Sequence, residues 1–373
     1  MLDEIIKPLR DPVRGRQMLA EIQARWHTLA ARRGRPIVLM EFCGTHTVAL
    51  ARTGIRSLLL PEVELKSGPG CPVCVTDARD LDRAIALASV PGVTVATFGD
   101  LLRVPGSRGS LQEARAQGAD VQVVASPLDA LQLAIAHRER QVVFLAAGFE
   151  TTAPATAVTV QAAARQGVEN FFVYSLHKMT PPGLRAVLGD REIGIDGVIL
   201  PGHVSLIVGR QAWDFVAEEH QLPGVVAGFE PVELLAALGL MALHWDEEPQ
   251  ILNAYERVVR ERGNGAAQQA LAESFVPVDA HWRGLGLLPG SGLALAERYR
   301  QWDAVVQFAD CWRDLEPPKP IAGCRCGDVL RGVCTPLDCR LFGQGCSPAT
   351  PVGPCMVSQE GTCAAYARFA VAK

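Results

Sequence analysis

Short apolar runs bounded by glycine and proline recur along roughly the first 230 residues, and they constrain the fold more than any other feature of the chain. Runs of this kind are typical of buried strands. We expect strands at 37–40, 58–60, 93–98, 121–124, 142–147, 171–174, 198–200 and 225–227. Alanine- and leucine-rich segments of helical length lie between them, at 78–88, 127–137, 153–166 and 205–220. This alternation predicts right-handed βαβ units and mostly parallel sheets.

Two stretches of the chain resemble each other weakly. MEFCGTHTVALA (40–51) and AAGFETTAPATA (146–157) both have the pattern of a strand, a polar loop and a helix of small residues. The tripeptide GFE of residues 148–150 occurs again at 228–230. The pattern indicates two similar α/β domains that divide near residue 125.

The 373 residues are enough for two or three domains of ordinary size. We expect an α/β fold with two Rossmann-like parallel-sheet domains, at 1–125 and 126–232, followed by a mainly helical, cysteine-rich domain at 233–373. Within the third domain, the segments 233–244, 251–262 and 292–299 have the composition of helices.

Composition and charge exclude several classes of protein. With 49% hydrophobic and 20% charged residues, the chain has large buried cores and is not a disordered protein. With a net charge of −4 and scattered basic residues, the sequence does not indicate a basic surface for nucleic-acid binding. There is no uninterrupted apolar stretch of about 18 residues, and the charged amino terminus lacks the apolar core of a signal peptide. We therefore expect a cytoplasmic location without membrane insertion.

Seven of the eleven cysteines lie in the last fifty residues, after a proline-rich break at 316–320. They are Cys324, Cys326, Cys334, Cys339, Cys346, Cys355 and Cys363. A secreted disulfide scaffold would be short and rich in cysteine throughout. No histidine follows His281, so iron–sulfur ligation is favoured over a mixed cysteine and histidine zinc site, although structural zinc stays an alternative.

Ligands of open parallel sheets bind at the carboxyl ends of the strands, so the loops that follow strands are the candidate sites. The loop EFCGTHT, at 41–47, places the thiol of Cys43 and the imidazole of His46 three residues apart. At a helix start, the helix dipole lowers a thiol pKa and favours the thiolate. The alternative is a buried cysteine with a helix-capping threonine.

The segment SGPGCPVC, at 67–74, contains a CxxC pair before an alanine-rich helix. Cys71 and Cys74 are interpreted as a redox pair rather than a structural metal site, because a zinc knuckle needs a second pair at finger spacing. Glycine and proline at 68–70 predict an exposed turn, which makes two unrelated core cysteines a poor alternative.

Three more loops follow expected strands and carry polar side chains: GFETTAP at 148–154, SLHK at 175–178 and PGHVS at 201–205. Glu150, His177 and His203 are therefore candidates to meet Cys43 in one crevice. A structural role is the alternative for each, because threonines cap helices and a lone histidine is more often structural. Sequence signatures of nucleotide binding, serine hydrolysis and zinc proteolysis are absent.

Together these motifs resemble the HypD family of hydrogenase formation proteins over nearly the whole chain. The resemblance rests on EFCGTHT, GPGCPVC, GFETTAP, GHVS and the tail from CRCG (324–327) to GPCMVSQEGTC (353–363). It implies two similar α/β domains plus a third that carries a cluster. It also implies a maturation factor for [NiFe]-hydrogenases that acts with the small partner HypC. On such a scaffold, the resemblance implies, an iron would acquire carbon monoxide and cyanide, the latter delivered by HypE from carbamoyl phosphate processed by HypF.

The resemblance also assigns roles to residues. Cys43 would bind the iron together with a cysteine of HypC, with His46 or His203 as a ligand or proton donor, and Glu150 belongs to the same candidate site. Cys71 and Cys74 would be the redox-active dithiol. The family's C-x14-C-x6-C-x16-C spacing for a [4Fe-4S] cluster falls here on Cys324, Cys339, Cys346 and Cys363.

Cys326 and Cys355 remain possible substitute ligands or a second thiol pair, whereas Cys311 and Cys334 are interpreted as incidental. The resulting hypothesis is that the cluster supplies electrons to the Cys71/Cys74 pair in support of ligand attachment at Cys43. The alternative function is a thiol–disulfide oxidoreductase of the ferredoxin:thioredoxin reductase type, in which Cys43 is only structural.

Overall fold

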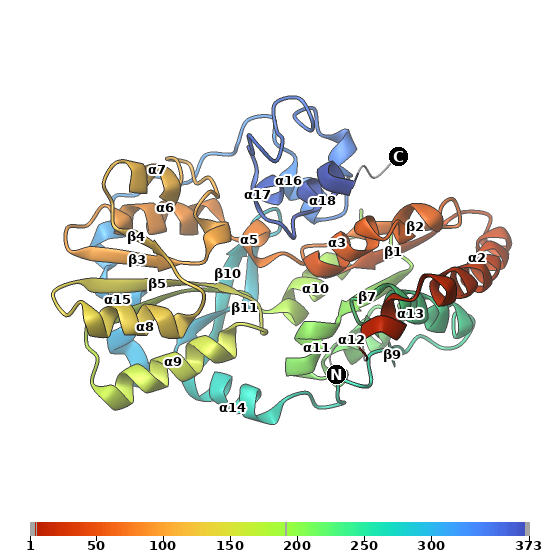
Figure 1. The fold of residues 1–373 in the computed structure, drawn as a ribbon, viewed down its shortest axis with the longest axis horizontal. Coiled ribbons are helices and arrows are strands. Elements are labelled where there is room, and N and C mark those ends of the chain that lie inside the picture. The colour runs from red at the N-terminus through yellow and green to blue at the C-terminus, as the bar shows by residue number, and fades with distance from the viewer. Residues whose placement is uncertain (1–3, 5, 191, 370–373) are drawn as a thin grey trace.

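Two parallel sheets form the body of the protein, as a computed structural model of residues 4, 6–190 and 192–369 shows (Figure 1). The first sheet has the strand order β2 (Val63–Ser67), β1 (Ile37–Glu41), β7 (Gly197–Pro201), β8 (Gly224–Ala227), β9 (Ile251–Asn253). The second has the order β4 (Val121–Val123), β3 (Val93–Thr97), β5 (Gln141–Gly148), β6 (Phe171–His177). The predicted pair of parallel α/β units is confirmed.

Helices surround both sheets. Those of the first unit are η1 (Lys7–Arg10), α2 (Pro12–Arg33), α3 (Gly44–Arg52), α4 (Ile55–Leu58), α11 (Gly202–Val208), η3 (Gln211–Trp213), α12 (Asp214–Glu218) and α13 (Pro231–Leu243). Those that accompany the second sheet are α5 (Pro72–Val75), α6 (Ala78–Ala88), η2 (Gly99–Leu101), α7 (Leu111–Ala116), α8 (Pro127–Ala136), α9 (Ala153–Gln166) and α10 (Thr180–Leu188). None of the helices in the described part of the chain combines the length and apolar character that a membrane span requires.

Local sequence explains where the longer helices begin and end. Helix α9 has a proline in its first turn and ends at Gly167, whose φ of 64° lies in the left-handed region. Proline suits a helix start because its missing N–H would have no partner there, and glycine tolerates the left-handed end. Strand β5 is buried along its whole length after Gln141, which fits a central parallel strand covered on both faces.

The chain divides between the sheets differently from the expected boundary near residue 125. Strands β3 and β4 precede that boundary but pair in one sheet with β5 and β6, which follow it. Strand β7 returns to the first sheet and pairs with β1, with Leu39 opposite Gly197. The expected division at 125 and 232 is therefore wrong for the sheets: apolar runs reveal strands, but they do not reveal which strands pair.

Four expected elements also differ. Residues 58–60 end α4 and form a turn, and the strand is β2 just beyond. The segment 205–220 is broken after α11 at Gly209, whose φ is 91°. Residues 251–253 form β9, and most of 254–262 is irregular. Residues 292–295 belong to a strand, and only 297–302 are helical, as a 3-10 helix.

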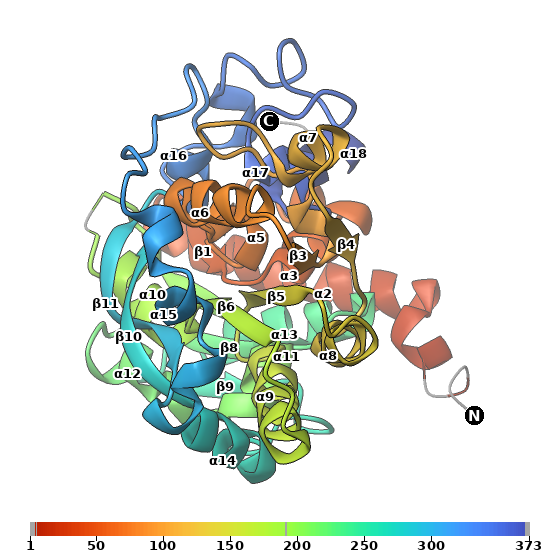
Figure 2. The same ribbon diagram turned by 90° about the vertical axis from the view of Figure 1, so that its left-hand side faces the viewer.

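An antiparallel hairpin and a cysteine-rich segment complete the molecule. The hairpin consists of β10 (Phe275–Trp282) and β11 (Gly286–Leu295), and Figure 2 shows it along one side of the second unit. The other elements of this part are α14 (Gly265–Ser274), η4 (Glu297–Trp302), α15 (Ala304–Gln307), η5 (Ala309–Trp312), α16 (Cys326–Leu330), η6 (Pro336–Asp338), α17 (Pro354–Val357) and α18 (Thr362–Phe369). The cysteine-rich segment lies over the junction of the two units, next to α3 and α5 (Figure 1).

One hydrophobic core joins the two units. It includes Met40 and Leu200 from the first sheet and Val143 and Leu145 from the second, all buried. Cys74 of the CxxC motif lies in the same core. Because burial of this apolar surface stabilises the contact, the CxxC segment is fixed where the two sheets and the cysteine-rich segment meet.

Candidate functional site

The loops that follow β1, β7 and β8 adjoin at the carboxyl edge of the first sheet, because these three strands are neighbours. Cys43 is the residue that directly precedes α3, and His203 lies in the first turn of α11. The ring of Phe229, after β8, stacks on His46 at 4.6 Å and on His203 at 3.8 Å between ring centroids. The structure thus brings together the two predicted histidines, beside the loop that carries Cys43.

Cys43 is a partly exposed residue at the start of α3. Burial raises the pKa of Cys43 to about 12. The backbone N–H of His46 lowers this pKa and the carboxylates of Glu360 and Glu41 raise it, each by less than burial does. The helix dipole therefore does not lower the pKa of this thiol as expected, because desolvation raises it by more. An iron ion would displace the thiol proton on binding.

Glu41 is a buried carboxylate that supports the Cys43 loop, and sequence reasoning missed it. Its oxygens accept hydrogen bonds from the Cys43 backbone N–H at 3.3 Å and from the Thr47 hydroxyl at 2.6 Å, and Arg56 lies 3.2 Å away. Burial raises the pKa of Glu41 to about 7, although Arg56 opposes this shift. The available signal was a glutamate at the end of the otherwise apolar run Ile37–Glu41.

His46 is fully buried, and its Nε2 lies 3.0 Å from the carbonyl oxygen of Gly228. A carbonyl can only accept, so Nε2 carries the proton. Burial lowers the pKa of His46 to about 4, which keeps the ring neutral. Its Nδ1 is buried and has no hydrogen-bond partner among the described residues. The neutral ring therefore offers a lone pair at Nδ1 and no proton there.

Cys71 and Cys74 form a disulfide, with Cα atoms 5.2 Å apart. The glycine–proline–glycine turn before them is buried rather than exposed as expected. A side chain at Gly70 would overlap the backbone of Cys43, and the N–H of Gly44 donates to the carbonyl oxygen of Gly70 at 2.9 Å. The absence of a side chain lets the two loops touch, so the disulfide lies next to the Cys43 loop.

Six cysteines line one small cavity in the cysteine-rich segment: Cys324, Cys326, Cys339, Cys346, Cys355 and Cys363. Cys334 lines a different cavity, between β2 and the loop after α16. The six include all four residues with the spacing expected for a cluster. The described residues contain no group of three or more His, Cys, Asp or Glu placed around a single metal ion.

The sulfur atoms of Cys326 and Cys355 lie 2.8 Å apart, as a pair within the cavity. Contact with Cys355 lowers the pKa of Cys326, and the same contact raises the pKa of Cys355. Burial raises the pKa of Cys324 to about 11 and also raises that of Cys363. Four thiols around one volume, with a separate pair beside them, fit the donor set of a four-iron cluster, in which each thiolate binds a different iron.

Contacts connect this cavity with the other two sets of cysteines. The sulfur of Cys74 lies 3.9 Å from the carbonyl oxygen of Pro354, which precedes Cys355. The hydroxyl of Thr45 donates to the carboxylate of Glu360 at 2.6 Å. Glu360 belongs to the tail motif but was not identified as a site residue from sequence, because its partner is 315 positions away. Cys43, the disulfide and the cysteine cavity thus form one continuous region.

Glu150 lies in the second unit, and its carboxylate accepts hydrogen bonds at the start of α10. Its two oxygens accept hydrogen bonds from the backbone N–H of Thr180 at 2.7 Å and from the hydroxyl of Thr180 at 2.6 Å. Burial raises the pKa of Glu150 to about 7. His177 is likewise buried, with Nε2 3.2 Å from the Thr156 hydroxyl. The structure does not bring these two residues together with Cys43.

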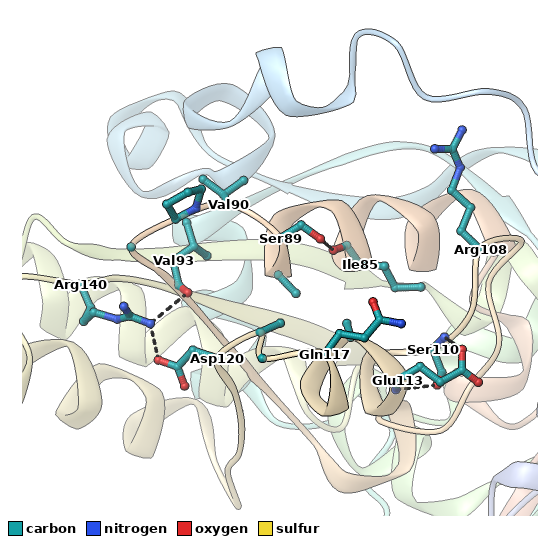
Figure 3. Close-up of a pocket in the computed structure, with 16 residues that line it drawn as sticks. Ile85, Ser89, Val90, Val93, Arg108, Ser110, Glu113, Gln117, Asp120 and Arg140 are labelled. Carbon is teal, nitrogen blue, oxygen red and sulfur yellow. Dashed lines mark hydrogen bonds and ion pairs between the residues drawn. The ribbon is translucent and has the colours of Figure 1, made fainter.

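Figure 3 shows a polar cavity elsewhere in the second unit, at the amino ends of β3, β4 and β5. The guanidinium of Arg140 lies 2.6 Å from the carboxylate of Asp120, and Glu113 accepts from the backbone of Ser110 at the start of α7. These charged groups already have partners. Because the cavity is at the edge opposite to the carboxyl ends, it is not part of the candidate site.

Comparison with known proteins gives concordant matches over nearly the whole chain. The HypD family model, described as "Hydrogenase formation hypA family", matches residues 16–370. "Hydrogenase maturation factor HypD" of Rhodobacter capsulatus is 44% identical over 368 residues, which cover 98% of this chain and 97% of the relative. The protein of the same name from Escherichia coli (strain K12) is 43% identical over 367 residues, or 96% of both chains. The chain therefore belongs to the HypD family of hydrogenase maturation factors.

Proposed function

We propose that the chain is a scaffold for the iron of [NiFe]-hydrogenases. Together with a small HypC-like partner, it holds the iron while cyanide and carbon monoxide are attached, the cyanide coming from a HypE-like donor supplied by HypF. One observation carries this proposal: the half-buried Cys43, the Cys71–Cys74 disulfide and the six-cysteine cavity are in contact, one after another. A thiol anchor, a two-electron couple and a cluster site are thus within one region.

Cys43 is the proposed anchor of the iron, which is the cargo of the protein. As a residue it is partly exposed, whereas Cys71 and Cys74 are 3% and 0% exposed. Soft thiolate ligands suit a low-spin ferrous ion that carries cyanide and carbon monoxide. The second thiolate would come from the partner. His203 is exposed beside this loop, and the Nδ1 lone pair of His46 suits a ligand or proton acceptor rather than a proton donor.

The cysteine cavity is the proposed site of a [4Fe-4S] cluster, held by Cys324, Cys339, Cys346 and Cys363. A bound cluster of this type exchanges single electrons. Cys326 and Cys355, 2.8 Å apart, then form a second thiol pair beside those ligands. The Cys71–Cys74 disulfide would take up two electrons and two protons to become two thiols, so this pair would store electrons for ligand attachment at Cys43.

Replacing Cys71 by Ala tests the dithiol directly. The variant should retain the visible absorption of the cluster and lose hydrogenase maturation in cells that lack their own copy of the protein. Cys311→Ala is the control, because Cys311 lies apart from the cavity cysteines and from the disulfide. Retained maturation in Cys71→Ala would exclude the electron store. Metal analysis of the protein purified without oxygen should find iron, whereas zinc without iron would favour a zinc-stabilised adaptor.

The second candidate is a thiol–disulfide oxidoreductase of the ferredoxin:thioredoxin reductase type. The contact between the Cys71–Cys74 disulfide and the cysteine cavity is the observation that favours it. Burial of both disulfide cysteines opposes it, because a protein substrate has no access to them in this conformation. A Cys43→Ala variant separates the two functions: an oxidoreductase would still reduce disulfide substrates, whereas the scaffold would no longer retain iron.

A further inference from the structure

Helices α3 and α18 lie side by side and run in the same direction (Figure 1). Ala51, near the carboxyl end of α3, packs with Ala365 and Tyr366 in the middle of α18. Thr45, at the amino end of α3, contacts Glu360, which shortly precedes α18. Cys43 precedes α3 directly, and Cys363 lies in the first turn of α18. The proposed iron anchor and one proposed cluster ligand therefore lie at the starts of two packed helices.

Glu360 makes the contact between these two helix starts. Its carboxylate accepts the hydroxyl hydrogen bond of Thr45 at 2.6 Å, a length typical of a bond to a charged acceptor. A Cβ on Gly44 would lie 2.7 Å from both the Cβ and the carbonyl oxygen of Glu360. The backbone of the Cys43 loop and the turn that contains Glu360 are consequently in direct contact, with no space for a side chain between them.

The turn at 358–361 is itself held between two cysteines of the cavity. The Glu360 N–H donates to the Ser358 hydroxyl at 3.3 Å, and the Gly361 N–H donates to the Ser358 carbonyl at 3.1 Å. A side chain on Gly361 would overlap the backbone of Cys355, so the turn packs directly on that residue. Cys355 precedes the turn by three residues and Cys363 follows Gly361 by two, so the turn connects two cysteines of the cavity.

We propose that Glu360 is a positioning residue that makes the placement of Cys43 depend on the state of the cysteine cavity. This inference rests on the proposed function. When the four proposed cluster ligands are bound, the fixed position of Cys363, two residues after Gly361, holds the 358–361 turn, and Glu360 holds the first turn of α3 through Thr45. When they are free, the turn and the start of α3 gain mobility. Cys43 then presents its thiol to iron in one arrangement only when the cavity is filled.

The test measures how fast iodoacetamide labels Cys43 in the full-length protein, with the cluster reconstituted and with the metal removed. Peptide mass spectrometry reports Cys43 separately from the other cysteines. The quantity of interest is the ratio of the two rates, because a uniform change in thiol reactivity cancels in it. Visible absorption and iron content confirm that each sample is filled or empty.

For the natural chain we expect labelling to be about fivefold or more slower in the filled protein, the effect that one ordinary hydrogen bond supports. Glu360→Ala and Thr45→Val should bring the ratio close to one, and the double variant should add nothing to either change. Glu360→Gln and Thr45→Ser retain an acceptor and a hydroxyl respectively, so they should keep the ratio of the natural chain. This rescue separates positioning from a general loss of structure.

A ratio near one in the natural chain would overturn the inference, as would an unchanged ratio in both Glu360→Ala and Thr45→Val. If Glu360→Ala fails to fill its cavity, Thr45→Val decides, because Thr45 lies outside the cysteine-rich segment. Failure of the proposed function gives a different result: the natural chain would then bind no cluster or no iron at Cys43. A natural chain that fills its cavity and binds iron, but shows no coupling, would refute only the role of Glu360.

Discussion

The loop after β1 and the loop after β5 begin alike and differ in chemistry. Each follows a buried strand and leads into a helix of small residues, and each unit has a buried glutamate at this edge. Glu41 has a buried cation, Arg56, 3.2 Å away and accepts the N–H of Cys43. Glu150 caps α10 through Thr180 and has no salt-bridge partner in the described part of the chain.

The difference shows how one supersecondary pattern serves two purposes. In the first unit, the ion pair of Glu41 and Arg56 fixes the backbone before a partly exposed cysteine, so the loop can present Cys43. In the second unit, the buried carboxylate of Glu150 instead positions the next helix, α10. Both glutamates are buried, and burial raises the pKa of each to about 7, so the two sites differ in the partners of the carboxylate rather than in its exposure.

The largest expected effect comes from breaking the ion pair of the first loop. Arg56→Met leaves the buried Glu41 without its cation, and loss of one partner of a buried pair costs about 3–5 kcal/mol of unfolding free energy. Urea unfolding measures this loss. Arg32→Met, at an exposed pair with Asp246, is the matched control and should cost less than about 1 kcal/mol. Similar losses in both variants would show that the buried pair of Glu41 and Arg56 contributes no more than an exposed ion pair, against the role given to it in the first loop.

The pH dependence of stability tests the second loop. The pKa of Glu150 is raised in the folded state from 4.5 to about 7, so folding is most favourable when this carboxyl is protonated, and its contribution falls as the pH rises between these values. Glu150→Gln should be more stable relative to the natural chain at pH 8 than at pH 5, by at most about 3 kcal/mol. Urea unfolding at both pH values checks this. If the stability difference between Glu150→Gln and the natural chain were the same at both pH values, folding would not raise the pKa of Glu150.

A smaller effect compares two equivalent hydroxyl groups. Thr47 and Thr180 each donate a hydrogen bond of 2.6 Å to the buried glutamate of their unit. We expect Thr180→Val to cost more than Thr47→Val, at about 2 and 1 kcal/mol of unfolding free energy, because Glu41 keeps Arg56 when its threonine is lost. Urea unfolding of the two variants in parallel measures the difference. The reverse order would contradict the role given to Arg56.

Local signals in the sequence predicted much of the fold. Helix α6 follows from its composition, α9 from its composition and from the proline and glycine at its ends, and β5 from a long apolar run. Strand β2 was not predicted, because it is an edge strand without a continuous apolar run. Val63 and Leu65 are buried, while Glu64 between them is exposed. Which strands share a sheet depends on pairing between distant segments, and no local pattern encodes that pairing.

Site residues were predicted from the sequence where the residue type itself indicates the chemistry. Properties that depend on contacts between distant segments were missed. Cys43, the CxxC pair and the cavity cysteines were identifiable as thiols, and the two histidines near Phe229 as loop residues. The raised pKa of Cys43 was not predictable, because it arises from burial by other segments. The contact of Glu360 with Thr45 joins positions that are far apart in the chain, so a single sequence gives no sign of it.

The central claim is that Cys43 anchors an iron that carries cyanide and carbon monoxide. The most direct test is an infrared spectrum of the protein, purified without oxygen together with its HypC-like partner. We predict stretching bands of iron-bound cyanide and carbon monoxide in the natural chain, and no such bands in Cys43→Ala, in which the visible absorption of the cluster persists. Bands that survive in Cys43→Ala, or no bands from a natural chain that holds its cluster, would contradict the account.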